Sequence, residues 1–126
     1  AGTARNLEAL GFPMGGNVDT LLTKGEQAGW GSAKSTRWAV VAKDYRILLM
    51  IGDNLGDFTD AYKGTPAERQ AVYEANAGKW GREWIALPNP GYGSWESAPF
   101  GHDHSLSADE KRDRKRDALE AWSGQP

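Results

Sequence analysis

The chain has 126 residues and a mass of 13.7 kDa, enough for one domain and short for two, so residues 1–126 are expected to form a single domain. It contains no cysteine, which excludes disulfide bridges, thiolate metal sites and a cysteine nucleophile. Its 15 basic and 17 acidic residues nearly cancel, which argues against a nucleic-acid polymer as partner, and no apolar run approaches the roughly 20 residues that cross a bilayer.

Helix-like and strand-like segments alternate along the chain, a pattern that predicts an α/β fold with a Rossmann-like parallel sheet and flanking helices. In the first half we expect a helix over Thr3–Leu10, a short strand over Val18–Thr23, an amphipathic helix over Ser32–Lys43 and a strand over Arg46–Ile51. The last segment is the clearest strand. Its continuous apolar run is typical of a strand covered on both faces.

The second half has stronger local signals. Thr65 and Glu68 can form a capping box, and Pro66 suits the first position of a helix expected to run to about Ala77. A third strand is predicted over Trp84–Leu87. It is followed by a Gly/Pro/aromatic loop over residues 89–100 and by a terminal helix over Ser107–Trp122, which begins with a capping box between Ser107 and Glu110.

The motif Gly52-Asp53-Asn54-Leu55-Gly56-Asp57-Phe58 directly follows the clearest strand. Ligands of open α/β sheets bind beyond the carboxyl ends of the strands, so this position suits a site. Asp53 and Asp57 can converge in a glycine-punctuated turn, and one or two carboxylates with several waters suit Mg²⁺. The alternative is a helix N-cap at Asp53 or Asn54 with an ordinary surface aspartate.

Two further segments can reach the same edge of the sheet. Lys34 lies early in the helix before the motif, where an ammonium could neutralise a phosphoryl group or a carboxylate; the alternative is an exposed surface lysine. Tyr92 lies on the loop after the third strand, where an aromatic ring can stack on a flat base. Trp95, on the same loop, is expected to pack against the core.

Other chemistry-bearing residues fit structural roles better. His102 and His104 flank an aspartate, but there are no other histidines, so surface positions are favoured over a metal site. Most of the six tryptophans, including Trp80 and Trp84, are expected to pack in the core or at its edge, and the charge run over residues 109–117 to form a solvated helix face.

Three features in this order resemble the C-terminal half of bacterial class C acid phosphatases of the haloacid dehalogenase superfamily: a lysine within SAKSTR, the GDNLGDF motif, and LPNPGYGSWE. The opening segment TARNLEALGFP also resembles that family, so the likeness covers nearly the whole chain. Members of the family dephosphorylate nucleoside 5′-monophosphates in the bacterial cell envelope. The resemblance therefore implies a small phosphomonoester substrate and an acid phosphatase or 5′-nucleotidase of the periplasm or outer membrane.

The resemblance also implies roles for individual residues. Lys34 matches the phosphate-neutralising lysine, and Asp53 matches an acid that ligates Mg²⁺. Asp57 matches the second acid of that motif, which supports the metal site through water or a hydrogen bond. Tyr92 matches an aromatic that stacks on the nucleobase, and we group Asn54 with it as a substrate-binding residue. The implied chemistry runs through an aspartyl-phosphate intermediate.

The family's D-x-D-x-T motif, which carries the nucleophile, is absent, because no two of the nine aspartates are two residues apart. We therefore expect the chain to be the C-terminal portion of a longer enzyme, inactive without the N-terminal half, with an incomplete core and possible self-association. The alternatives are a non-catalytic nucleotide-binding or storage relative of the same fold and an unrelated aromatic-rich module that binds sugars. An exposed sheet edge is expected in the first case.

Overall fold

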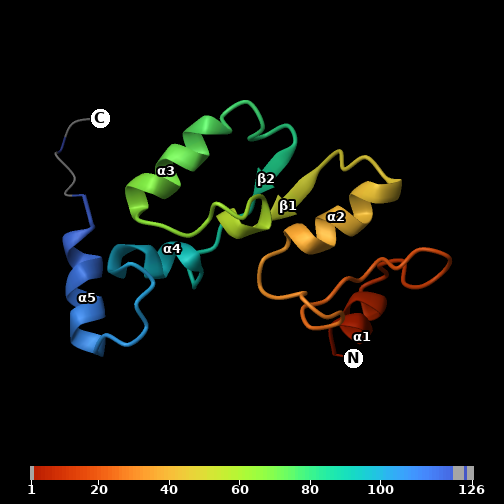
Figure 1. The fold of residues 1–126 in the computed structure, drawn as a ribbon, viewed down its shortest axis with the longest axis horizontal. Helices are drawn as coiled ribbons and strands as arrows, with labels where there is room; N and C mark the ends of the chain where they lie inside the picture. The colour runs from red at the N-terminus through yellow and green to blue at the C-terminus, as the bar shows by residue number, and fades with distance from the viewer. Residues whose placement is uncertain (1, 121–123, 125–126) are drawn as a thin grey trace.

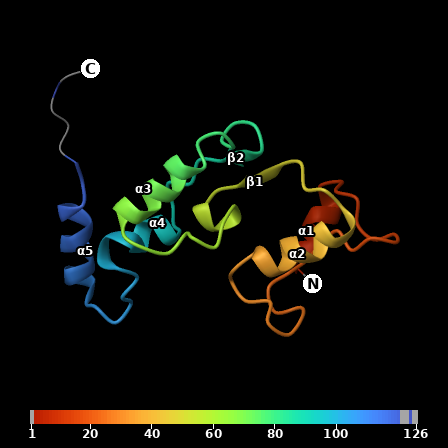
Figure 2. The same cartoon turned by 45° about the horizontal axis from the view of Figure 1, so that its top comes forward.

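A computed structural model describes residues 2–120 and 124. Its sheet consists of two parallel strands, β1 (Met50–Gly52) and β2 (Trp84–Ala86), in which Met50 pairs with Trp84 and Gly52 with Ala86. Helices flank both sides: α1 and α2 lie on one side of the strands, and α3, α4 and α5 on the other (Figure 1 and Figure 2). The α/β class with an incomplete Rossmann-like core is confirmed.

The helices follow the predicted order. They are α1 (Gly2–Ala9), α2 (Ser35–Asp44), α3 (Pro66–Ala75), α4 (Ser94–Ser97) and α5 (Ala108–Asp117), with 3₁₀ turns η1 (Leu55–Asp57) and η2 (Ala98–Phe100). None of the helices in the described part of the chain is both long and apolar enough to span a membrane. Trp122, placed at the end of the last predicted helix, lies outside the described residues.

Both predicted capping boxes are confirmed. Thr65 accepts from the backbone N–H of Glu68, whose carboxylate accepts from the N–H of Thr65 at 2.7 Å. Ser107 and Glu110 make the same reciprocal pair at the start of α5. Each box satisfies backbone donors that the first turn of a helix leaves free, so these starts depend on local sequence alone.

The strand predicted over Val18–Thr23 is wrong, because that segment is irregular. Its backbone donors are taken by nearby side chains: the N–H of Leu21 donates to Asp19 Oδ1 at 3.0 Å, and that of Thr23 to Glu26 Oε2 at 2.7 Å. Such local bonds compete with a strand ladder, which needs a neighbouring strand. The predicted sheet of three strands is therefore one of two within residues 2–120 and 124.

The predicted strand over Arg46–Ile51 shortens to Met50–Gly52, and the expectation that both its faces are covered is wrong. Leu48 is 65% exposed and Ile51 60% exposed, and Ile47 and Leu49 are also exposed. Hydrogen bonding explains the difference, since β1 pairs only with β2 among the described residues. An apolar run has the composition of a strand, but it forms a strand only where a neighbouring strand hydrogen-bonds to it.

The core is small and aromatic. Phe58, 4% exposed, packs against Trp80 and Trp84 with ring centroids 5.2 and 5.5 Å away, and the two tryptophan rings meet each other edge to face at 5.2 Å. Tyr73 of α3 stacks on Trp80 at 4.9 Å. The packing roles expected for Trp80 and Trp84 are confirmed, and this cluster fixes α3 and the turn after β1 against the start of β2.

The segment over residues 89–100 differs from the predicted loop, because its second half forms α4 and η2. Trp95 within it is 40% exposed, so the expectation that it packs the segment against the core is wrong. Ala98 and Phe100, both in η2, are buried instead, at 3% and 2% exposure. Trp95 is left at the surface of the segment.

Candidate functional site

The turn after β1 is organised around the carboxylate of Asp57. Its Oδ2 accepts from the backbone N–H groups of Asp53 and Asn54, at 2.8 and 2.9 Å. A Cβ on Gly52 would overlap the Asp57 side chain and come within 2.6 Å of its Cγ. The strand must therefore end in glycine for the carboxylate to lie beneath the backbone of the turn. The alternative is right about the cap, because Asn54 is the N-cap of η1, but its ordinary surface aspartate does not describe Asp57, whose side chain is only 11% exposed.

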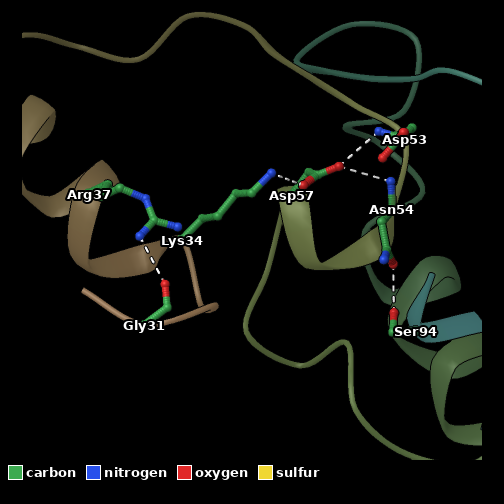
Figure 3. A network of polar contacts seen from close by, with 7 residues as sticks. All are labelled: Gly31, Lys34, Arg37, Asp53, Asn54, Asp57 and Ser94. Atoms are coloured by element: carbon green, nitrogen blue, oxygen red, sulfur yellow. Dashed lines mark hydrogen bonds and ion pairs between the residues drawn. The ribbon is translucent and has the colours of Figure 1, made fainter. Parts of the chain in front are cut away.

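Lys34 reaches the same carboxylate from the N-cap position of α2. Its ammonium forms an ion pair with Asp57 Oδ1 across 23 residues of sequence (Figure 3). Lys34 directly precedes α2, and one turn later the buried guanidinium of Arg37 donates to Gly31 O at 3.1 Å, which anchors the segment before the helix. The Lys34 side chain stays 48% exposed while its ammonium pairs with Asp57.

The charge state of Asp57 follows from these contacts. Burial raises the pKa of this carboxyl group, but the hydrogen bond from Lys34, the N–H groups of Asn54 and Asp53 and the lysine charge outweigh it, and the net pKa lies below its usual value. Asp57 is therefore ionised at neutral pH. Both of its oxygens are already engaged by donors, so it orients the turn and holds Lys34 in place.

Asp53 is the free carboxylate of the site. Only its backbone N–H is engaged, and within residues 2–120 and 124 the structure gives its exposed side chain neither a hydrogen bond nor an ion pair. The same part of the chain contains no group of three or more histidine, cysteine or acidic side chains that could enclose a metal ion. A single open carboxylate fits a Mg²⁺ ion that keeps most of its waters and takes substrate oxygens, and does not fit a closed structural site.

Asn54 connects the turn to two residues that the sequence analysis did not single out. Ser94 Oγ, at the first position of α4, donates to Asn54 Oδ1 at 2.6 Å (Figure 3). The guanidinium of Arg69 in α3 donates to the same hydroxyl at 2.8 Å and also to the carbonyl of Tyr62. These contacts join residues 25 and 40 positions apart, so no local spacing signal could have revealed them.

Tyr92 lies two residues before Ser94 and is 79% exposed. Its segment is held by Asn89, whose Nδ2 donates to the carbonyl of Tyr92 at 2.7 Å and whose Oδ1 accepts from the N–H of Gly91 at 3.1 Å. The ring is thus presented to solvent by a braced backbone that is tied to the Asp53 turn through Ser94. This geometry leaves the ring face available for stacking.

A cavity of about 370 Å³ runs from the turn to α3. Its walls include Asp53, Asn54, Phe58, Arg69, Tyr73 and Trp95. The wall thus carries the free carboxylate and one guanidinium, and most of the rest of it is apolar, with four aromatic rings. Trp95, which was predicted to pack against the core, lines this cavity instead.

His102 has a structural role that the sequence analysis missed. Its Nδ1 lies 2.7 Å from Ser97 Oγ, and its Nε2 accepts from the N–H of Gly64 at 3.2 Å. It is partly buried and links the segment after η2 to the start of α3, so the expectation of a plain surface position is wrong for it. His104 is exposed, and its ring meets Phe100 edge to face at 5.9 Å.

Comparison with known proteins places this geometry in a family. Residues 1–95 match the family model described as HAD superfamily, subfamily IIIB (acid phosphatase). The chain is also similar to the class C acid phosphatase from Bacillus anthracis, with 30% identity and a TM-score of 0.79, and to the same enzyme with tungstate bound, with 31% identity and a TM-score of 0.79. Each match covers 95% of this chain and 49% of the solved chain, so this chain spans about half the length of those proteins. The chain belongs to subfamily IIIB of the HAD superfamily, the acid phosphatase family.

Proposed function

We propose that the chain supplies the lysine, the metal carboxylate and the base-stacking segment of an acid phosphatase that acts on phosphomonoesters. The observation that carries this proposal is the arrangement around Asp57, whose largely buried, ionised carboxylate pairs with Lys34 through one oxygen and accepts through the other from the backbone of the turn that carries Asp53. An ammonium and an open carboxylate that are both held through one aspartate suit a phosphoryl group and its counter-ion. Membership of the acid phosphatase family and the tungstate-bound relative support the assignment.

Each residue has a distinct task in this proposal. Lys34 neutralises a phosphoryl oxygen, for which its half-exposed side chain is available. Asp57 accepts from two backbone N–H groups and so fixes the turn from which Asp53 projects. Asp53 would hold Mg²⁺ together with water and substrate oxygens. When bound, the metal would offset the negative charge on the phosphoryl oxygens.

The nucleophile would come from outside these 126 residues. A carboxylate oxygen attacks phosphorus, the ester oxygen departs with a proton, and water then cleaves the aspartyl phosphate to release inorganic phosphate. No D-x-D-x-T motif is present to supply that carboxylate. We therefore propose that the N-terminal half of such an enzyme completes the site, and that the chain by itself does not turn over substrate.

Nucleoside 5′-monophosphates are the proposed substrates, because Tyr92 offers an exposed ring on a braced segment tied to the turn. Stacking on an aromatic ring contributes about 1–3 kcal/mol per base and tolerates any base. The absent nucleophile motif equally favours a second candidate, a nucleotide-binding relative without catalysis. The two differ in whether phosphate is released once a nucleophile is supplied.

Phosphate release from AMP tests the proposal. The chain alone is compared with a fusion that joins it to the N-terminal half of the Bacillus anthracis relative, with the same fusion carrying Lys34→Ala as the matched variant. We expect release by the fusion, none by the chain alone, and a large loss in the Lys34→Ala fusion. Turnover by the chain alone contradicts the proposal, and a folded fusion that binds AMP without releasing phosphate favours the binding relative.

A further inference from the structure

Arg69 is a partly buried cation on the wall of the cavity. Loss of solvent lowers the pKa of its guanidinium, and the ion pairs of the described residues include no carboxylate bound to it. Its partners are instead the carbonyl of Tyr62 and the hydroxyl of Ser94. Burying a cation without an acid is costly, so the contacts that it makes are expected to serve a purpose beyond stability.

The contact between Arg69 and Ser94 decides which atom donates in the hydrogen bond between Ser94 and Asn54. A guanidinium can only donate, so Ser94 Oγ accepts from it and directs its single proton elsewhere. The hydroxyl lies 2.6 Å from Asn54 Oδ1, a distance typical of an O–H donor to an oxygen acceptor. The carboxamide of Asn54 is thereby fixed with its oxygen toward Ser94.

This orientation leaves the NH₂ group of Asn54 available. Within residues 2–120 and 124, Nδ2 makes no hydrogen bond, and no buried side-chain nitrogen or oxygen lacks a partner, so Nδ2 is accessible to solvent. A Cβ on Gly93 would lie 3.0 Å from Nδ2, so the group lies against the backbone that follows Tyr92. Asp53 and Asn54 line the same cavity, so a ligand that enters it can meet both the free donor and the free carboxylate.

We propose that Arg69 and Ser94 are positioning residues that turn the NH₂ group of Asn54 toward an oxyanion bound at the Asp53 turn. The ligand class is a phosphoryl group or an equivalent tetrahedral oxyanion, so the inference deepens, and rests on, the proposed phosphatase function. The charge of Arg69 strengthens the chain of bonds, because a hydroxyl that accepts from a cation becomes a stronger donor. These hydrogen bonds also join α3 and the segment that carries Tyr92 to the turn at Asp53.

Nuclear magnetic resonance of the ¹⁵N-labelled chain, followed through a tungstate titration with Mg²⁺ present, tests the inference. We expect the side-chain NH₂ signals of Asn54 to lie apart from those of free asparagines and to move as tungstate binds. Ser94→Ala should return these signals toward the positions of free asparagines and weaken tungstate binding about tenfold, which corresponds to about 1.4 kcal/mol. Ser94→Thr keeps the hydroxyl and should restore both readouts.

Matched controls separate positioning from folding. Ser105→Ala removes a serine hydroxyl of the segment before α5, and Arg82→Gln removes an exposed arginine; both should leave the Asn54 signals and the tungstate affinity unchanged. Unaltered Asn54 signals in Ser94→Ala and Arg69→Gln would overturn the positioning inference. If the wild-type signals respond to Ser94→Ala but do not move with tungstate, the positioning contact holds while the oxyanion role inferred for it is wrong; the proposed function is decided separately, by phosphate release from the fusion.

Discussion

Replacing Asp57 with asparagine tests the centre of the site through the stability of the fold. The substitution removes the charge that pairs with Lys34 and accepts from the N–H groups of Asp53 and Asn54. Hydrogen bonds to a charged group contribute about 1.5–3 kcal/mol each, whereas the pair with a half-exposed lysine adds about 0–1 kcal/mol. Because the asparagine oxygen can still accept one backbone N–H, we expect a loss of about 2–3 kcal/mol in the free energy of unfolding.

The stability that the Asp57 carboxylate contributes should depend on pH in a definite direction. The pKa of Asp57 in the folded chain is lowered, so its contribution is fully present above the pKa of about 3.9 that an aspartate has in the unfolded chain. The contribution is lost as the pH falls through the lower folded pKa. The stability difference between wild type and Asp57→Asn should therefore be constant from about pH 5 to 7 and shrink below about pH 4.

Urea unfolding followed by tryptophan fluorescence, at a series of pH values, measures this difference. Asp60→Asn is the matched control, because Asp60 is an exposed aspartate a few residues away with no hydrogen bond or ion pair in the described residues. We expect Asp60→Asn to match wild type within about 0.5 kcal/mol. An Asp57→Asn chain as stable as Asp60→Asn at pH 7 would refute the role assigned to this carboxylate.

Three further substitutions probe separate parts of the account. Gly52→Ala forces a methyl group into Asp57, so a loss of at least about 1–3 kcal/mol and a lower Tm are expected; an unchanged Tm would contradict the close approach. Thr65→Ala removes the N-cap of α3 and should cost about 1 kcal/mol in urea unfolding, which Thr65→Ser should largely restore. Tyr92→Ala should leave Tm unchanged and weaken AMP binding without affecting that of inorganic phosphate, since stacking contributes about 1–3 kcal/mol; equal weakening of both would refute a base contact.

The parts of the fold that sequence predicted well are those that depend on near neighbours. The starts of α3 and α5 follow from Thr65 with Glu68 and Ser107 with Glu110, because both partners of each bond lie within one helical turn. The strands were less predictable. Arg46–Ile51 has the composition of a buried strand, but its extent is decided by the neighbour that pairs with it.

The candidate site shows the same division. Asp53, Asn54 and Asp57 could be predicted to lie together because they share one motif after a strand, and their mutual hydrogen bonds span three or four residues. Lys34 was singled out from its place before that strand, and its pairing with Asp57 needed the fold. Arg69 was not singled out, since an arginine in an amphipathic helix has the signature of a surface residue until its buried contacts are known.

Calorimetric titration of the 126-residue chain with AMP, with and without Mg²⁺, tests the central claim most directly. Wild type and the control variant Asp60→Asn should bind AMP more tightly when Mg²⁺ is present. Asp53→Asn should lose that dependence on the metal, because Asp53 is the carboxylate left free by its neighbours. AMP binding that ignores both Mg²⁺ and the Asp53 substitution would contradict the claim that this turn is the metal and phosphate site.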